Sequence, residues 1–157
     1  VQCLPFDDGS FDAVVANHML YCAQDRHAAI AEIRRVLRRS GHLYASTNGK
    51  AHMRELDDLV RRFDPQYRLD SGSAVFGLEN GREQLLEHFA AVDLHRYDDA
   101  LVVTDAMALV EWAQSWAPGT FPVETLPDFY AHMEREGGKG AIRVGKDSGL
   151  FVATSQD

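Results

Sequence analysis

Two apolar stretches on either side of a helical pattern constrain the fold of this chain more than any other feature. Residues 11–16 are mostly apolar without clean alternation, which is typical of a strand buried on both faces, as in a parallel sheet. Asp25 is a favoured N-cap residue, apolar residues recur at helical spacing through residues 29–37, and Gly41 favours a C-cap. Residues 43–47 form a second apolar run. The pattern predicts two parallel strands joined by a right-handed crossover helix.

Four later stretches also carry apolar residues at helical spacing. Asn80, with Glu83 three residues on, has the arrangement of a capping box. Residues 63–78 contain proline and glycine with little periodicity, which predicts a loop. The expected helices occupy residues 53–63, 80–89, 109–116 and 126–133.

Strand-like runs occupy the rest of the C-terminal half. Residues 92–103 are interrupted by Asp98-Asp99, which predicts a bent or broken strand. Residues 141–144 and 150–154 flank the sequence Gly-Lys-Asp-Ser-Gly, which predicts a terminal antiparallel hairpin or paired edge. The order of elements therefore predicts an α/β domain with a mixed sheet.

Ligands of open α/β sheets bind outside the carboxyl ends of the parallel strands. Two segments of this chain, residues 17–21 and residues 47–50, follow the two strands predicted to be parallel. The strand pattern alone therefore places a candidate site at these two segments.

Composition narrows the classes of function. The 157 residues suit one domain, and the net charge of −8 argues against binding to nucleic acid or to an anionic membrane. No apolar window of about 18 residues predicts a membrane span, and the N-terminus lacks the pattern of a signal peptide. Cys3 and Cys22 fit neither a disulfide framework nor a metal motif, so we expect reduced thiols in a cytoplasmic protein. The seven histidines show no H-x-x-x-H or H-E-x-x-H spacing, which predicts no metal site.

Two motifs carry a family resemblance. Leu4-Pro5-Phe6 is followed by Ser10-Phe11-Asp12 and a strand, and Glu32 to Leu37 reads E-I-R-R-V-L before Gly41. These residues resemble the LPF-x-x-x-SFD and E-x-x-RVL-x-x-GG signatures of small-molecule, class I S-adenosylmethionine-dependent methyltransferases. The resemblance implies a Rossmann-like methyltransferase sheet, mixed through a C-terminal antiparallel β pair, and S-adenosylmethionine as cofactor. One departure is that Ser40-Gly41 stands where the family has two glycines.

A second departure concerns the cofactor. The family holds it mainly through a glycine-rich turn and acidic residues that precede the LPF segment, and this sequence has only Val1-Gln2-Cys3 before Leu4. We therefore expect a single, N-terminally incomplete methyltransferase domain over residues 1–157 that lacks its first strands. The resemblance assigns residues 105–138 to a helical lid or substrate wall.

The resemblance also implies roles for individual residues. Because His has a pKa near neutrality, His18 and His52 are the candidates for a general base. The candidates for cofactor binding are Val1, Gln2, Asn17, His18 and Met19. The candidates for substrate binding are Tyr21, Asn48, Trp112, Trp116 and Tyr130. A structural reading competes with each role, because a histidine at a strand end is often only hydrogen-bonded and an aromatic stripe often only fills a core.

Three functional hypotheses follow. The first is methyl transfer from S-adenosylmethionine to a small-molecule acceptor. The second is a catalytically inactive, truncated domain that self-associates through the exposed edge of the strand at residues 11–16, or pairs with a partner chain. The third is a fragment of a nucleotide-binding dehydrogenase, which the α/β pattern permits but the two signatures do not favour.

Overall fold

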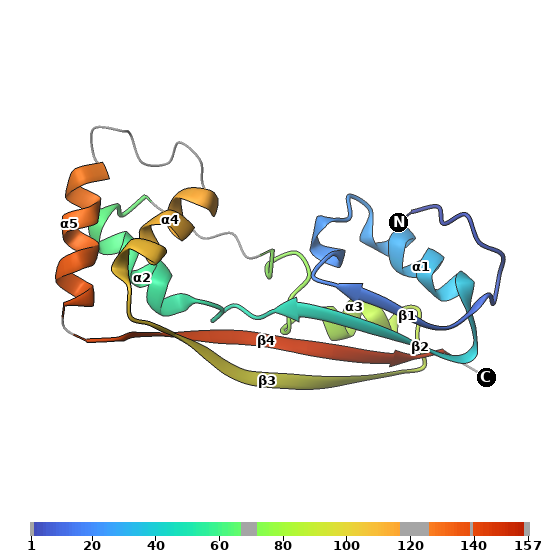
Figure 1. The fold of residues 1–157 in the computed structure, drawn as a ribbon. Helices are drawn as coiled ribbons and strands as arrows, with labels where there is room; N and C mark the ends of the chain where they lie inside the picture. Colours follow the sequence, from blue (N-terminus) through green and yellow to red (C-terminus); the bar gives the residue numbers. More distant parts are fainter. Residues whose placement is uncertain (1, 67–71, 117–125, 139, 156–157) are drawn as a thin grey trace. The chain divides into compact units, whose positions relative to one another are not determined.

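A computed structural model of the chain describes residues 2–66, 72–116, 126–138 and 140–155. Its contacts divide the chain into two compact units, of which unit 1 comprises residues 1–52, 71–98 and 147–157, and unit 2 comprises residues 53–70 and 99–146. The elements are β1 (Phe11–Asn17), η1 (Leu20–Cys22), α1 (Arg26–Val36), β2 (Leu37–Asn48), α2 (Arg54–Phe63), α3 (Gly81–Leu86), β3 (Ala91–Val103), α4 (Ala106–Trp116), α5 (Leu126–Gly137) and β4 (Ile142–Thr154) (Figure 1).

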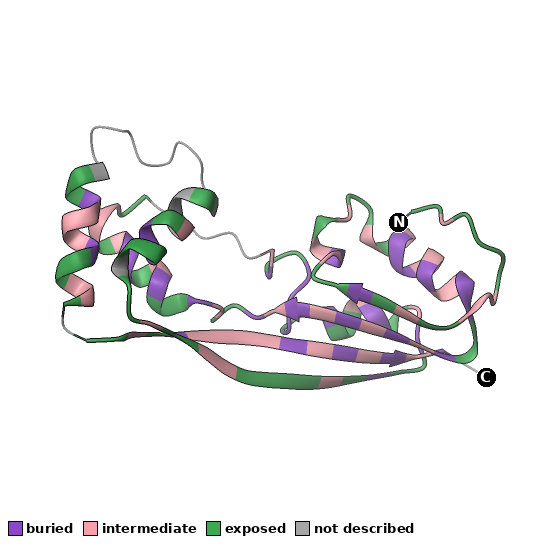
Figure 2. Ribbon diagram, viewed as in Figure 1, coloured by how far each residue is buried: buried purple, intermediate pink, exposed green. Residues whose placement is uncertain are grey.

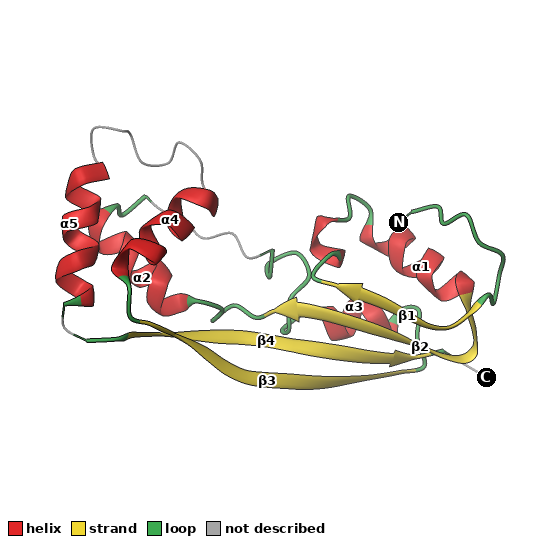
Figure 3. Ribbon diagram, in the orientation of Figure 1, coloured by secondary structure: helices red, strands yellow, loops and turns green. Residues whose placement is uncertain are grey.

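The four strands form one sheet in the order β1-β2-β4-β3. β1 and β2 are parallel, with Ala16 opposite Ala45, and helix α1 makes the crossover between them. β2 and β4 are antiparallel, with Ser46 opposite Leu150. In the described part of the chain, at least one helix lies between each strand and the next along the sequence (Figure 3). The mixed α/β sheet predicted from the sequence is confirmed.

The core of unit 1 lies on one face of the sheet. Along β2, buried residues such as Leu43 and Ala45 alternate with partly exposed ones such as Tyr44 (Figure 2). The buried face packs against apolar residues of α1, α3 and the loop before α3, including Ile33, Leu85 and Phe76. Alternation of this kind means that the described elements of unit 1 cover one side of β2.

Burial of β1 on both faces, as expected from its apolar run, is therefore wrong. Ala16 is buried, but Val15 on the opposite face is 64% exposed. A six-residue run cannot show which elements will cover its second face. β1 also ends the described sheet, since its neighbour on one side is β2 and the strand order lists none on the other.

Unit 2 has a core of its own. The stripes predicted for α2, α4 and α5 are confirmed as helices, and their inward residues meet in one cluster. Its fully buried members include Leu56, Val110, Phe129 and Met133. None of the helices in the described part of the chain is long and apolar enough to cross a membrane.

Two details of the predicted helix ends are wrong. Helix α1 begins after the predicted cap, where the Asp25 carboxylate accepts from the Ala28 N–H at 2.9 Å, but it ends at Val36 rather than near Gly41. Leu37 turns directly into β2, so Gly41 lies within the strand. Helix α3 begins directly after Asn80, as predicted, but the Asn80 side chain makes no cap hydrogen bond, because its oxygen accepts from the Gly77 N–H instead.

The C-terminal strand also differs from its prediction. β4 runs without a hairpin from Ile142 to Thr154, through the sequence expected to turn. The reason is pairing with β2, in which Asn48 lies opposite Ser148 and Thr47 opposite Gly149. The expected antiparallel pairing is present, but its partner is β2. β3 is likewise continuous through Asp98 and Asp99.

Candidate functional site

The loop before β1 is fixed to helix α1 by the residues of the two signatures. Arg35 forms ion pairs with Glu32 and with Asp8, the latter at 2.6 Å, and donates to the Leu4 carbonyl oxygen at 3.2 Å. Arg38 pairs with Asp12 at 2.7 Å. These contacts join the segment of the first signature, before β1, to the segment of the second. They therefore fix the position at which β1 begins.

The segment after β1 lies against the carboxyl end of β2. The His18 N–H donates to the Ser46 carbonyl oxygen at 3.1 Å and to the Ser46 hydroxyl at 3.2 Å. That hydroxyl donates to Asn17 Oδ1 at 3.2 Å. His18 has φ 47°, a left-handed conformation that is uncommon outside glycine and recurs at functional sites. Ser46 therefore joins the candidate residues Asn17 and His18.

A second polar group lies at the end of β2. The Ser148 hydroxyl donates to Asn48 Oδ1 at 3.0 Å and lies 3.3 Å from His52 Nδ1. A hydroxyl has one proton, so if Ser148 donates to Asn48, His52 must donate from Nδ1 and its basic lone pair is on Nε2. The candidates Asn48 and His52 are thus brought together by Ser148, which fixes the orientation of the imidazole.

An open cavity of about 360 Å³ lies in unit 1 beside the carboxyl ends of β1 and β2. His18 directly follows β1, Ser46 lies near the end of β2, and the remaining lining comes from the middle of β3 and of β4. Its lining residues are His18, Ser46, His95, Arg96, Tyr97, Ser148, Gly149 and Leu150. Arg96 also donates to Asp147 Oδ1 at 2.7 Å, and Asp147 Oδ2 accepts from the Ala51 N–H at 3.2 Å.

A second cavity, of about 380 Å³, lies beside the loop after β1. Gln2 and Met19, both candidates for cofactor binding, line it together with Cys22, Ala23 and Gln24. Both cysteines, Cys3 and Cys22, are free thiols at the surface. Val1 lies outside the described residues.

Tyr21 is half-buried against the core of unit 1. Burial, and to a lesser degree the neighbouring Cys22, raise the pKa of its phenol. A Cβ at Gly72 would lie 2.6 Å from the Tyr21 ring, so the ring packs directly on that glycine.

The aromatic candidates of the helical segment belong to unit 2. Trp112 and Tyr130 are partly buried against the cluster around Phe129 and Met133. Trp116 ends α4, and its side chain lies outside the described residues. Trp112 and Tyr130 therefore pack against the core of unit 2. Their roles as substrate contacts stay predictions.

Sequence reasoning missed the residues that connect the candidates. Ser46, Ser148 and Arg96 carried no motif, and Ser148 was assigned to a turn. The positions of these three residues depend on which strands pair. Only Ser46 could have been suspected as a site residue from the sequence, because it directly precedes the predicted site segment at residues 47–50.

Comparison with known proteins adds a family and a fold. Residues 1–45 match the family described as methyltransferase domain, and no curated protein matches the chain by sequence. Among solved structures, a protein of Bacillus halodurans C-125 assigned as a methyltransferase is 16% identical with a TM-score of 0.59, over 99% of this chain and 69% of that one. The YcgJ protein of Bacillus subtilis is 15% identical with a TM-score of 0.58, over 99% and 68%.

A third structure, a SAM-dependent methyltransferase of Thermotoga maritima, is 13% identical with a TM-score of 0.51, over 99% of this chain and 61% of that one. Identities this low show a common fold. The matched segment contains both signatures, β1, α1 and most of β2. In its first 45 residues by sequence, and along its length by fold, the chain resembles the class I S-adenosylmethionine-dependent methyltransferases.

Proposed function

We propose that this chain takes part in methyl transfer from S-adenosylmethionine to a small-molecule acceptor. The observation that carries the proposal is the position of the family-matched segment. It contains β1, which ends at Asn17, and the residues His18 and Met19 that follow it, so these three residues lie at the carboxyl end of a strand in a parallel pair. That end is where open α/β sheets bind ligands.

The residues around the loop after β1 fit part of such a cofactor. The amides of Gln2 and Gln24 can each donate to and accept from an adenine or a carboxylate, and Met19 offers apolar contact. A cavity of about 380 Å³ lies within the usual size of small-molecule sites. When bound, S-adenosylmethionine supplies an electrophilic methyl group on a sulfonium, so the protein has mainly to orient the acceptor and exclude water.

A side chain acting as general base would remove the proton from the acceptor. His52 is the better supported base of the two candidates, because Ser148 and Asn48 orient its ring. His18 lines the cavity at the strand ends, where it would contact a ligand. We assign the substrate wall to residues 105–138, with Trp112, Trp116 and Tyr130 as aromatic contacts, and the acceptor side of unit 1 to Tyr21 and Asn48.

A second candidate function is favoured by the exposed position of β1. β1 ends the described sheet and Val15 is 64% exposed, so a further strand could pair with its open edge. In this alternative the chain acts through self-association, or through a partner chain, without catalysis of its own.

Calorimetric titration of S-adenosylhomocysteine into the 157-residue chain, with the mass in solution measured alongside, tests both. We expect micromolar binding, weakened about tenfold by Met19→Ala, since loss of about 1.4 kcal/mol of contact is tenfold in affinity. A matched control is His42→Ala, because His42 lies on β2 opposite Ala13, away from the carboxyl end.

Absence of binding by a folded, oligomeric chain would overturn the first function and favour the second. Binding with equal affinity in the Met19 variant would place the cofactor elsewhere in the chain. For the base, His52→Gln should keep the affinity for S-adenosylhomocysteine and lower turnover of an acceptor. A parallel loss of affinity would assign His52 to cofactor binding instead.

A further inference from the structure

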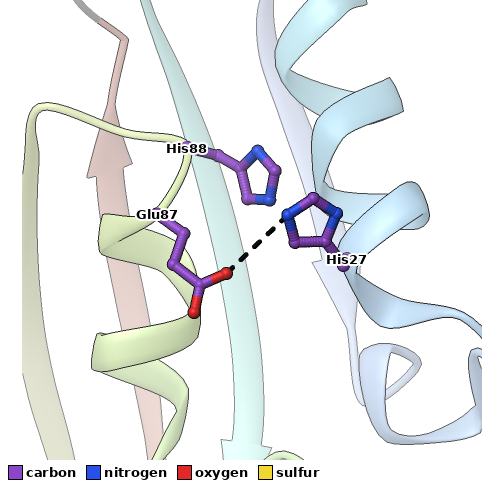
Figure 4. A group of neighbouring side chains, drawn as sticks. All are labelled: His27, Glu87 and His88. Carbon is purple, nitrogen blue, oxygen red and sulfur yellow. Dashed lines mark ion pairs between the residues drawn. The ribbon is translucent and has the colours of Figure 1, made fainter.

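Three side chains that can ligate a metal meet in unit 1, away from the strand-end cavity. His27 lies in the first turn of α1, and Glu87 and His88 directly follow α3 (Figure 4). Each offers one ligand atom, and these atoms lie within 4.8 Å of one another. His27 Nε2 lies 3.8 Å from Glu87 Oε2, and the ring centroids of His27 and His88 are 4.4 Å apart.

His88 has an unsatisfied nitrogen at this place. Its Nε2 is buried and has no hydrogen-bond partner among the described residues. Figure 4 shows a ring nitrogen of His88 facing the ring of His27. Burial, with the nearby His27 as a lesser cause, lowers the pKa of His88 and so favours the neutral imidazole, the form that binds metals. A buried nitrogen without a partner is a cost to the fold that a ligand would remove.

We propose that His27, Glu87 and His88 bind a Zn²⁺ ion that links helix α1 to helix α3. Two imidazole nitrogens and one carboxylate oxygen are a donor set of zinc sites with three protein ligands. Such sites keep a fourth position open for water. Two imidazoles and a single carboxylate also suit a borderline divalent ion better than Mg²⁺ or Ca²⁺, which prefer oxygen ligands.

The ligand atoms need only small rotations to close on an ion. Zinc–ligand distances of about 2.0–2.2 Å put tetrahedral donors roughly 3.5 Å apart, which is closer than some of the separations here. The side chains of His27 and Glu87 are 70% and 61% exposed, so both can change rotamer without disturbing the core. Only His88 is constrained by burial, and it supplies the fixed point of the site.

The surroundings leave room for the fourth position. A cavity of about 480 Å³ adjoins the cluster and is lined by His27, Glu87 and neighbouring residues of α1 and α3. Arg26 Nε donates to Gln84 Oε1 at 3.1 Å across this cavity and already links the two helices beside the cluster. An ion would add a second link at the same junction.

Titration of Zn²⁺ into the untagged 157-residue chain, in competition with a chromophoric chelator, tests the proposal. We expect one equivalent bound, an affinity at least tenfold lower in His27→Gln and in Glu87→Gln, and no change in His42→Gln. These ligand variants change exposed side chains and should remain folded, whereas His88→Gln alters a half-buried one. Co²⁺ in place of Zn²⁺ should give the visible absorption of a four-coordinate ion in the unsubstituted chain and in His42→Gln, but not in the ligand variants.

Thermal unfolding gives a second readout. An ion that binds the folded chain raises Tm, and the rise is larger when the ion binds more tightly, so Zn²⁺ should raise Tm of the unsubstituted chain more than that of Glu87→Gln. Equal affinity in all variants, or no binding at millimolar Zn²⁺, overturns the proposal. Binding lost in Cys22→Ser and retained in Glu87→Gln would also overturn it, because the ion would then be at the thiol.

Discussion

Unit 1 and unit 2 each have a core of fully buried apolar side chains, but they differ in what their residues do outside the core. Phe151 in unit 1 and Phe129 in unit 2 are both fully buried. Unit 1 contains both signatures, the strand-end cavity and the histidine cluster. Unit 2 is built from three helices around an apolar cluster, and the family match does not reach it.

From this difference we expect most residues that bind ligands to lie in unit 1. In unit 1, polar side chains from elements distant in sequence meet at strand and helix ends, as Ser148 meets Asn48 and His52. In unit 2, the clearest sequence signal is the apolar stripe on each of the helices α2, α4 and α5. Substitutions that are expected to affect one unit and not the other therefore test this comparison best.

The largest effect is expected for Phe151→Ala. Phe151 is fully buried in unit 1, its ring meets Phe76 edge to face at 5.9 Å, and it stands against Gly81. Removing the ring leaves a cavity among β4, α3 and the loop before α3, at a cost of about 3–5 kcal/mol. Urea denaturation measures the loss. Hydrogen exchange should rise first in β2 and α1, and a uniform rise over both units would contradict two separate cores.

Phe129→Ala is the counterpart in unit 2. Phe129 is fully buried and packs against Phe63 at a centroid distance of 5.1 Å, but in a smaller cluster. We expect a loss of about 3 kcal/mol, with faster exchange first in α2, α4 and α5. Affinity for S-adenosylhomocysteine in the folded fraction should be retained. A fall in this affinity would mean that the ligand site depends on unit 2 as well.

A smaller contrast lies within one strand. A Cβ at Gly149, in unit 1, would lie 2.9 Å from the backbone carbonyl oxygen of His95, whereas a Cβ at Gly145, in unit 2, would meet Glu55 only at 3.5 Å. Gly149→Ala must therefore push β3 and β4 apart, at about 1–3 kcal/mol. Gly145→Ala should stay within about 0.5 kcal/mol. Equal urea midpoints for the two variants would refute this steric difference.

Much of the fold could be predicted because its signals are local. The run at β1, the Asp25 cap and the stripes of α2, α4 and α5 are each contained in one short stretch of sequence. The predictions that failed depend on partners. Gly145 to Gly149 has the composition of a turn, but pairing of Ser148 with Asn48 keeps it in the strand. Local preference is a weak guide where a neighbouring strand decides the backbone.

The candidate site shows the same limit. Asn17, His18 and Met19 could be predicted because they directly follow a strand, and Ser46 joins the first two. The proximity of His27 and His88 could not be predicted, because His27 lies in α1, His88 follows α3, and no short sequence motif joins them. The residues at the end of a helix or strand can therefore be predicted from sequence more readily than the contacts between the ends of different elements.

The smallest expected effect concerns pH and belongs to unit 2. Backbone N–H groups of Glu55 itself and of Gly145 lower the pKa of Glu55 below its ordinary 4.5, and Lys146, at 2.7 Å, lowers the pKa of Asp99 below its ordinary 3.8. Both carboxylates bind a proton less readily in the folded chain than in the unfolded one. Their stabilisation is present above pH 4.5 and is lost as pH falls through the folded pKa values.

Urea midpoints measured at steps from pH 6 to pH 3 check this prediction. The unsubstituted chain should lose stability below pH 4.5, and Glu55→Gln should show a shallower fall because a neutral amide cannot titrate. Because Gly145 N–H donates to Glu55 Oε2 at 3.0 Å, an amide oxygen can still accept that bond, so the variant removes the charge and keeps the contact. Faster hydrogen exchange in acid should then appear first around α2 and the unit 2 part of β4. An equally steep fall in Glu55→Gln would assign the acid sensitivity to other carboxylates and remove this difference between the units.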